Sequence, residues 1–194
     1  MNASLTPQPA LSRARARRRR GLSLFQALMV LGLAAGAVVG AVTLYNTTTE
    51  VQARNDTQAL ITQLVVATQR IHQGASSYGG TSTTAINLAQ TLDVRGSIPA
   101  SAKTGSGAAV AIRHAFGGAL VVEGVGDRFR ITLNDLQQAN CTQLLDPYIG
   151  QARASGGLFS VSNGTTTNNL PMDVAGVATL CADANDNDIE LTFE

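Results

Sequence analysis

The chain contains no tryptophan and few aromatic residues of any kind. Aromatic side chains make up 4% of its 194 residues, so it offers little surface on which single-stranded nucleic acid could stack. It has only two cysteines, and they show neither Cys-x-x-Cys nor Cys/His spacing, which does not support a structural zinc site. Charge is also missing from one long stretch, because no charged residue lies between Arg20 and Glu50.

The uncharged stretch contains an apolar segment that is long enough to cross a membrane. Residues 22–44 would extend about 34 Å as a helix, which exceeds the hydrocarbon thickness of a bilayer. Six arginines precede this segment between Arg13 and Arg20. An excess of Lys and Arg beside a span keeps that flank in the cytoplasm, so we expect the bulk of the chain on the far side. A nucleic-acid arm is the less favoured interpretation of these arginines, because an uninterrupted apolar span follows them.

The overall charge conceals an asymmetry along the chain. The whole chain carries +1, but six of its 14 basic residues precede Gly21 and all 13 acidic residues follow it. Removal of residues 1–21 would leave eight basic and 13 acidic residues, a net charge of −5. A mildly acidic domain is poorly suited to holding phosphate backbones, so we expect no nucleic-acid partner.

The junction between the arginines and the apolar segment resembles the leader of a type IV prepilin. An ordinary secretory signal has a small-residue cleavage site after its apolar region, whereas here Gly21 precedes that region. In type IV prepilins a membrane peptidase cuts after such a glycine, and the apolar segment stays on the mature protein. The resemblance implies cleavage between Gly21 and Leu22 and N-methylation of Leu22. A long leader and a first mature residue other than Phe point to the type IVb branch.

The resemblance extends over nearly the whole chain. Its motifs follow the order seen in the PilS-like thin-pilus pilins of conjugative plasmids, and the toxin-coregulated pilin has the same plan of two cysteines. The matching positions are residues 21–24, 27–31, 97–99, 116–118 and 131–133, with Cys141 and Cys181. Such pilins polymerise into helical fibres with their N-terminal helices in the core and their C-terminal domains exposed. The resemblance therefore implies a structural role without catalysis.

Residues 22–73 predict one long helix with two different halves. The first half, to residue 45, is apolar on all sides, whereas the second half is amphipathic. The apolar positions of the second half are Leu60, Ile61, Leu64, Val65, Ala67 and Ile71. Between the halves, residues 46–49 read Asn-Thr-Thr-Thr, a poor helix-forming sequence where we expect a soft joint. The alternative is a signal anchor followed by an unrelated helix.

The rest of the chain predicts short strands and helices joined by loops rich in glycine. We expect strands at 109–112, 119–123, 128–133, 158–161 and 189–193, and helices at 85–92, 134–154 and 174–181. Asn134 or Asp135 is expected to cap the middle helix, and Pro147 to kink or break it. Residues 74–107 are expected to form a long loop that contains the short helix at 85–92, residues 162–169 a loop, and residues 124–126 a turn.

These elements predict an α+β fold in which the long helix packs on an antiparallel sheet, as in type IV pilins. The expected organisation is a leader at 1–21, a transmembrane or filament-core half-helix at 22–45, and a globular domain at 46–194. The precursor is expected in the inner membrane of a Gram-negative bacterium with this domain in the periplasm. The assembled form is expected in an extracellular pilus.

Four residues of the apolar half are candidates for assembly. Gly32, Gly36 and Gly40 recur every four residues, which puts small residues on one helix face and allows another helix to approach closely. Gln26 stands at the fifth mature position, where most type IV pilins have a glutamate thought to neutralise the N-terminal amine of a neighbouring subunit. Glutamine brings no charge. The sequence therefore leaves open an abundant subunit or a minor, priming or tip component.

The two cysteines lie in the part of the chain that is expected to be exported. An even number of cysteines in an oxidising compartment suggests one disulfide, between Cys141 and Cys181. His72 and His114 stand in no recognisable catalytic spacing, so we expect them to be surface or packing residues. No cofactor is expected.

The acidic segment near the end of the sequence offers a weak calcium candidate. Asp183, Asn185, Asn187 and Glu194 occupy positions 1, 3, 5 and 12 of a calcium-loop pattern. However, Asp188 stands where the sharp turn needs glycine. A solvated turn before the last strand is the favoured interpretation.

The sequence thus favours a structural subunit of a type IVb pilus that serves adhesion, aggregation or conjugation. Its expected partners are further copies of itself, the prepilin peptidase and the inner-membrane pilus assembly machinery. One alternative is a minor pilin, or a pseudopilin of a machine like type II secretion. Another is a membrane-anchored binding domain that is never cut at Gly21.

Overall fold

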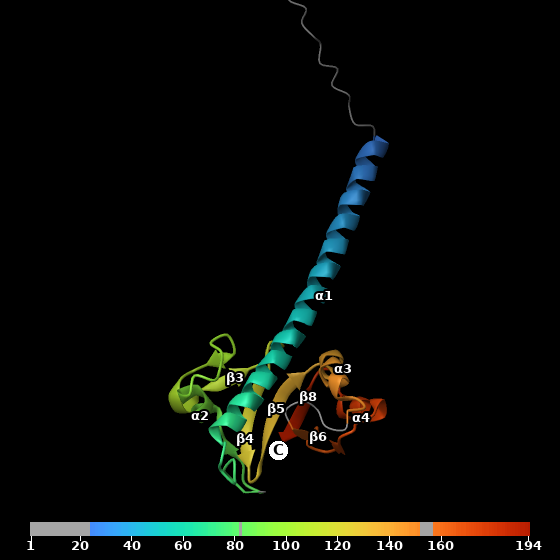
Figure 1. Ribbon diagram of the computed structural model, residues 1–194. Helices are drawn as coiled ribbons and strands as arrows, with labels where there is room; N and C mark the ends of the chain where they lie inside the picture. Colours follow the sequence, from blue (N-terminus) through green and yellow to red (C-terminus); the bar gives the residue numbers. More distant parts are fainter. Residues whose placement is uncertain (1–23, 82, 152–156) are drawn as a thin grey trace, which may run out of the picture. The chain divides into compact units, whose positions relative to one another are not determined.

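The computed structural model describes residues 24–81, 83–151 and 157–194, and it begins with one long helix, α1 (Leu24–Ile71) (Figure 1). The helix continues without interruption through residues 46–49, so the expected soft joint is not a break in the helix. Here the Thr49 hydroxyl donates to the carbonyl of Asn46 at 2.8 Å, a bond within the helix that polar side chains can make without ending it. The boundary between two compact units falls between Tyr45 and Asn46.

The described residues of the second unit form one sheet of eight strands. The strands are β1 (Ile86–Asn87), β2 (Lys103–Thr104), β3 (Ala111–Arg113), β4 (Ala119–Val125), β5 (Arg128–Leu136), β6 (Leu158–Ser162), β7 (Thr167–Asn169) and β8 (Asn187–Phe193). Their order is β2-β3-β4-β5-β8-β6-β7, with β1 paired to β4, and all of these pairs are antiparallel. The α+β fold predicted from the sequence is therefore confirmed.

Alternation along the central strands creates the buried face of the sheet. Side chains at every second position of β5 as far as Leu133, and of β8, are fully or almost fully buried. The register pairs Phe129 with Phe193 and Ile131 with Leu191. The two phenylalanine rings stack with their centroids 5.1 Å apart. The second half of α1 packs on this face through residues at helical spacing, namely Leu60, Ile61, Leu64 and Val65. Period two in the strands and period 3.6 in the helix thus meet in one core.

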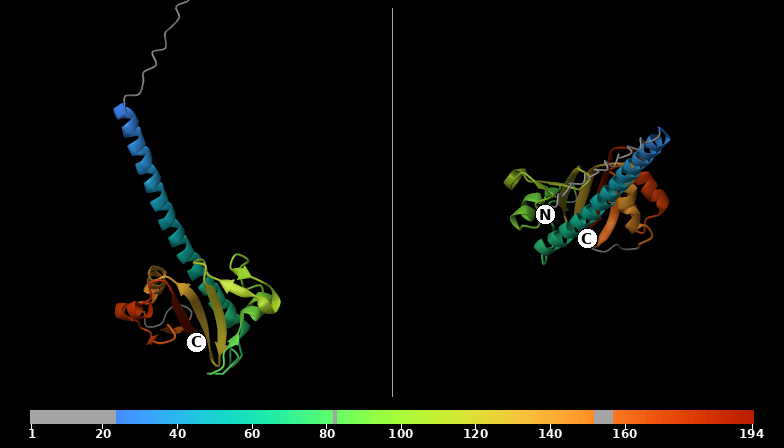
Figure 2. Two further views of the ribbon diagram at one scale, coloured as in Figure 1. Left: turned by 180° about the vertical axis from the view of Figure 1, so that it is seen from behind. Right: turned by 90° about the horizontal axis from the view of Figure 1, so that it is seen from above.

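Three short helices flank the sheet on opposite sides of the second half of α1 (Figures 1 and 2). On one side, α2 (Ala89–Val94) lies near β3 and β4, with the 3-10 turn η1 (Gly107–Ala109). On the other side, α3 (Gln138–Leu145) and α4 (Val174–Leu180) lie together, with the 3-10 turn η2 (Asp146–Tyr148) after α3. The domain therefore has an α2 edge and an α3/α4 edge.

Two segments around residues 85–94 and 134–138 differ from the prediction because local hydrogen bonds and a bulge move the helix starts. Ile86 and Asn87 form β1 rather than helix, and the side chain of Asn87 accepts from the amide of Ala89 at 2.8 Å where α2 begins. Asn134 and Asp135 do not cap a helix. They continue β5 past a register shift, where Asp135 has a φ of 60°, and α3 begins only at Gln138 without a side-chain cap.

The remaining predicted elements are present, with shifted ends. The prediction for Pro147 is confirmed, because α3 ends at Leu145 and Pro147 lies in η2; residues 152–154 of the predicted helix lie outside the described part. Gly124 belongs to β4, so the turn expected at 124–126 is shorter than predicted. A carbon atom at the Cβ position of Gly124 would collide with the carbonyl of Tyr78, which explains why only glycine fits there. The loop expected at 162–169 contains β7.

Candidate assembly surfaces

The first half of α1 exposes nearly all of its apolar side chains. From Leu24 to Tyr45 its large apolar residues are between 53% exposed, at Val42, and 80% exposed, at Leu24. By length and composition, α1 is the one helix among the described residues that could cross a membrane. A continuous apolar surface of this kind marks a site of contact with lipid or with other protein. It is the first candidate surface for assembly.

The assembly residues predicted from the sequence lie on this half. A Cβ atom built on Gly32, Gly36 or Gly40 meets nothing within 4 Å, so each glycine faces open space in the single chain. Gln26 is exposed on the first turns of α1. Gly21 and Leu22, the predicted processing site, lie outside the described residues.

The second half of α1 borders an open groove on the α2 edge, with a volume of about 780 Å³. Its α1 side contains Val66, which is 40% exposed, and Ala67 and Ile71. Two exposed arginines, Arg70 from α1 and Arg95 just after α2, lie in its lining. Nothing in the sequence relates these two arginines, because only the fold brings the segment after α2 beside α1, where the side chain of Gln63 donates to the carbonyl of Ser97 at 3.1 Å. We call this surface the arginine groove.

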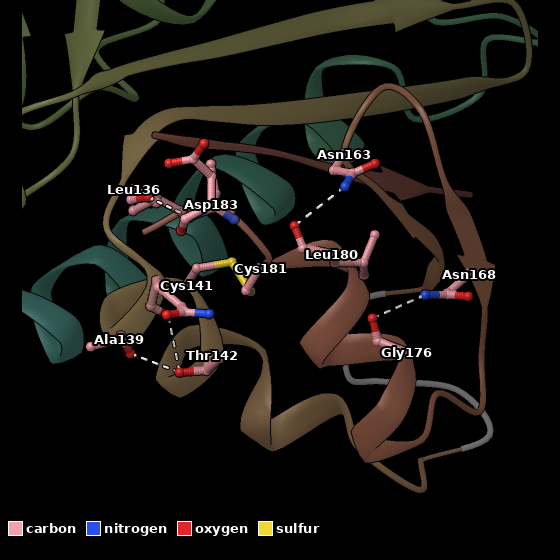
Figure 3. The surroundings of a disulfide bond; sticks show 12 residues. Leu136, Ala139, Cys141, Thr142, Asn163, Asn168, Gly176, Leu180, Cys181 and Asp183 are labelled. Atoms are coloured by element: carbon pink, nitrogen blue, oxygen red, sulfur yellow. Dashed lines mark hydrogen bonds between the residues drawn. A yellow bond between two sulfur atoms is a disulfide. The ribbon is translucent and has the colours of Figure 1, made fainter. Parts of the chain in front are cut away.

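A disulfide fixes the α3/α4 edge (Figure 3). Cys141 in α3 is bonded to Cys181 at the end of α4, with Cα atoms 5.8 Å apart and both residues fully buried. This is the pair expected from the sequence, and both thiols of the described chain are used in it. Close by, the side-chain amide of Asn187 donates to the carbonyl of Leu136 at 2.9 Å, which joins the end of β5 to the start of β8. The disulfide joins α3 to the end of α4, and the hydrogen bond of Asn187 joins the two strands beside them.

Three carboxylates lie together where α4 leads into β8: Asp183 and Asp186 in the turn, and Asp188 at the start of the strand. Asp183 accepts hydrogen bonds from the amides of Asn185 and Asp186 at 2.9 and 3.1 Å, which lower the pKa of its carboxyl group. Asp188 accepts from the amide of Asp135 at 3.2 Å. These carboxylates line a depression of about 330 Å³ whose described lining contains no lysine or arginine. We call this surface the acidic turn.

The geometry of the acidic turn differs from a calcium loop. The side-chain oxygen of Asn187 accepts from the amide of Asp183 at 3.0 Å, so it is used within the turn. Glu194 does not join the other candidates: it follows β8, a strand about 23 Å long, and its carboxylate pairs with Arg128 at 3.0 Å. No group of three or more His, Cys, Asp or Glu residues that could hold a metal is found within the described ranges.

The two histidines have packing environments rather than catalytic ones. His114 is 2% exposed, and its Nε2 atom lies 2.8 Å from the carbonyl oxygen of Asn134, so Nε2 carries the proton and donates. Its Nδ1 atom is buried and has no partner in the described structure. Burial lowers the pKa of this imidazole, against a smaller upward effect of the Asn134 carbonyl and of Asp135. His72 packs against the ring of Tyr78, with centroids 4.8 Å apart.

Most of the chain matches the model of one known protein family. Residues 51–194 match the model of the family described as PilS N terminal, whereas comparison with curated proteins gives no match. The matched range begins inside α1, in the amphipathic half, and covers all of the sheet, both cysteines and both edges. The apolar half of α1 and everything before it lie outside the match. With most of the chain matched, and with a long helix packed on an antiparallel sheet, the protein belongs to the PilS family of type IV pilins.

Proposed function

We propose that this chain is a structural subunit of a type IVb pilus, made as a membrane-anchored precursor and cut between Gly21 and Leu22. PilS pilins are a structural, non-enzymatic family, and membership indicates assembly into a filament. The observation that carries the proposal is the exposed apolar half of α1, which precedes the folded domain in one continuous helix. Such a half-helix suits a bilayer before assembly and a bundle of identical helices afterwards.

The physical argument concerns what replaces lipid around the helix. Lipid tails are as apolar as leucine, so transfer from membrane to filament gains little from the hydrophobic effect, and helix association depends on close packing. Gly32, Gly36 and Gly40 have open space at their Cβ positions, which allows the backbone of a neighbouring helix to come near. In this proposal the glycine face is the contact between helices in the filament core.

A minor pilin or a pseudopilin of a secretion machine is the second candidate, and Gln26 is the feature that favours it. Most type IV pilins, which this chain resembles, have a glutamate at this position, opposite the N-terminal amine of a neighbouring subunit. An amide can hydrogen-bond to that amine but does not neutralise it. A subunit with Gln26 would therefore assemble less readily alone, as a minor component does.

The test is to express the full chain with a prepilin peptidase and pilus machinery, and to measure the intact mass of the membrane and fibre forms. We expect a chain that starts at methylated Leu22. The variant Gly21→Leu should keep the leader and yield no fibres, whereas the matched variant Gly107→Leu, at a glycine of the folded domain, should still be cut. A mature wild-type protein that retains Arg13 to Arg20 would contradict the proposal. Mass identification of sheared fibres distinguishes a major subunit from a minor one.

A further inference from the structure

The charges of the folded domain are separated between its two edges. Three of the seven described basic side chains form ion pairs within the chain: Lys103 pairs with Asp93 at 2.8 Å, Arg128 with Glu194 at 3.0 Å, and Arg130 with Glu123 at 2.7 Å. Arg54 and Arg113 instead donate hydrogen bonds to uncharged oxygen atoms. The guanidinium groups of Arg70 and Arg95 take part in no hydrogen bond or ion pair among the described residues. Both lie in the arginine groove, whose lining contains no acidic residue. The α2 edge therefore presents two cations that the single chain leaves unbalanced.

The opposite edge presents the complementary charge. In the acidic turn three carboxylates lie around one depression, and no described basic residue lines it. Asp183 and Asp188 make hydrogen bonds to backbone amides, which fixes the turn, while the Asp186 carboxylate accepts none among the described residues. Asp183 is itself exposed and keeps its charge down to low pH, because two amides stabilise its ionised form. The acidic turn is thus a firmly held anionic surface.

The two surfaces cannot meet within one chain. The groove lies between α1 and the segment that follows α2, whereas the acidic turn follows α4. Helices α2 and α4 lie on opposite sides of the second half of α1 (Figures 1 and 2). Two complementary patches at opposite edges of one molecule favour a head-to-tail contact between copies. A contact of that kind does not pair a patch with itself, and it continues as a helix if the rotation does not close.

We propose that the arginine groove contacts the acidic turn of a second copy of this chain in the filament. This inference rests on the proposed function, because it assigns the contact between globular domains in the fibre. The cations of Arg70 and Arg95 face the carboxylates of the neighbour's Asp183, Asp186 and Asp188. The neighbour's turn covers Val66, which is 40% exposed in the single chain. Charge sets the direction of the contact, because a reversed subunit would bring groove against groove and turn against turn.

The test exchanges the charges of the two surfaces in cells that carry the pilus machinery. Arg95→Glu alone and Asp186→Arg alone should each lower the mass of sheared fibres at least roughly tenfold, because like charges then meet across the contact. The double variant Arg95→Glu/Asp186→Arg should restore fibres. Co-expression of the two single variants should also restore them, since alternating copies then match at every contact. Asp127→Arg reverses an exposed charge in the turn between β4 and β5, outside both surfaces, and should behave as wild type.

Each result has a distinct meaning. The Cys141–Cys181 bond on non-reducing gels and the thermal unfolding of the processed chain report whether a variant folds. A misfolded single variant would not regain fibres through a second reversal, so rescue itself shows that the charges meet. If the single variants fold and assemble as wild type, or if the double variant stays as low as they do, the inferred contact is wrong and the filament proposal stands. If processed wild type forms no fibre, the proposed function fails and the contact fails with it.

Discussion

The two halves of α1 belong to one helix and have opposite environments. In the first half, Leu33 is 72% exposed, and in the second half Leu64 is fully buried against the sheet. Both are leucines in the same secondary structure, so helix propensity does not separate them. The difference is that the domain at 46–194 supplies packing partners for the second half alone. Helix formation and helix burial are therefore separate properties in this protein, and the burial of the first half depends on other molecules.

Loss of the disulfide should have the largest effect. It should destabilise the domain at 46–194 and leave the first half of α1 unchanged. The bond links residues 40 positions apart, and the variant Cys141→Ser/Cys181→Ser should lower the free energy of unfolding of the domain by about 4 kcal/mol in the chain-entropy model. Denaturant unfolding of the full chain in detergent measures this. Membrane insertion of the precursor, followed by carbonate extraction, should be unchanged. A loss of insertion would show that the two halves are not independent.

A matched pair of leucine substitutions compares the two halves of α1 directly. Leu64→Ala should cost about 3 kcal/mol of domain stability, because it removes a fully buried side chain and leaves a cavity. Leu33→Ala should change the same measurement by less than about 0.5 kcal/mol, because an exposed site far from the core loses no packing. Both are measured as denaturant midpoints in one detergent. Equal effects for the two variants would contradict the division of α1 described above.

A charge at position 26 tests the first half alone. Gln26→Glu should raise fibre mass about fivefold at equal expression and equal processing, since a charged partner for a neighbour's amine adds about 1 kcal/mol to the contact. Domain stability should not change. The control is Gln52→Glu, on the exposed surface of α1 in the second unit, which adds the same charge. If wild type already forms abundant fibres and Gln26→Glu adds nothing, Gln26 is an adequate residue in a major pilin.

The smallest effect concerns pH and the second unit alone. Burial lowers the pKa of His114 below the ordinary 6.5, so the unfolded chain takes up a proton first as the pH falls. Domain stability should therefore be complete above about pH 7 and decrease as the pH falls below 6.5. Protonation would place a charge on Nδ1, which is buried and unpartnered. Asp135, and Asp56 and Arg113 of the adjoining pocket, are the charged groups nearby.

The check is a series of unfolding midpoints between pH 8 and pH 5. His114→Gln keeps a donor for the carbonyl of Asn134 and removes the titration, so its pH dependence in this range should be shallower than that of the wild type. Comparison at pH 8 separates the packing cost of the substitution from the titration. Parallel curves for the two proteins would exclude His114 as the source.

The periodicity of the apolar residues was enough to predict the core. It failed at the ends of elements, where single hydrogen bonds determine which residue begins a helix. The alternation of Phe129, Ile131 and Leu133 and the helical spacing of Leu60 and Leu64 define the same buried face in sequence and structure. The predicted start of the helix at residue 85 was wrong. Residues 86 and 87 form β1, and the side chain of Asn87 accepts from the amide of Ala89, where α2 begins. Local propensity in residues 85–92 does not contain that information.

The assembly surfaces divide in the same way. The apolar half of α1 is a property of consecutive residues and is visible in the sequence. The arginine groove depends on the segment after α2 lying beside α1. The geometry of the acidic turn depends on Asn187 and on the amide of Asp135. Sequence showed only the carboxylates there, as a possible calcium loop. Sites made by distant segments require the fold before their charges can be compared.

The position of the disulfide also has a consequence for how the chain folds. The central pair β5 and β8 joins residues such as Leu136 and Asn187, which are 51 positions apart. Pairings of this kind raise contact order and slow folding, because a long loop must close first. Cys141 and Cys181 lie just inside the two ends of the chain segment between Leu136 and Asn187. Once they are oxidised, the path from β5 to β8 shortens to roughly a dozen residues, and the most distant pairing at the centre of the sheet becomes nearly as local as a hairpin.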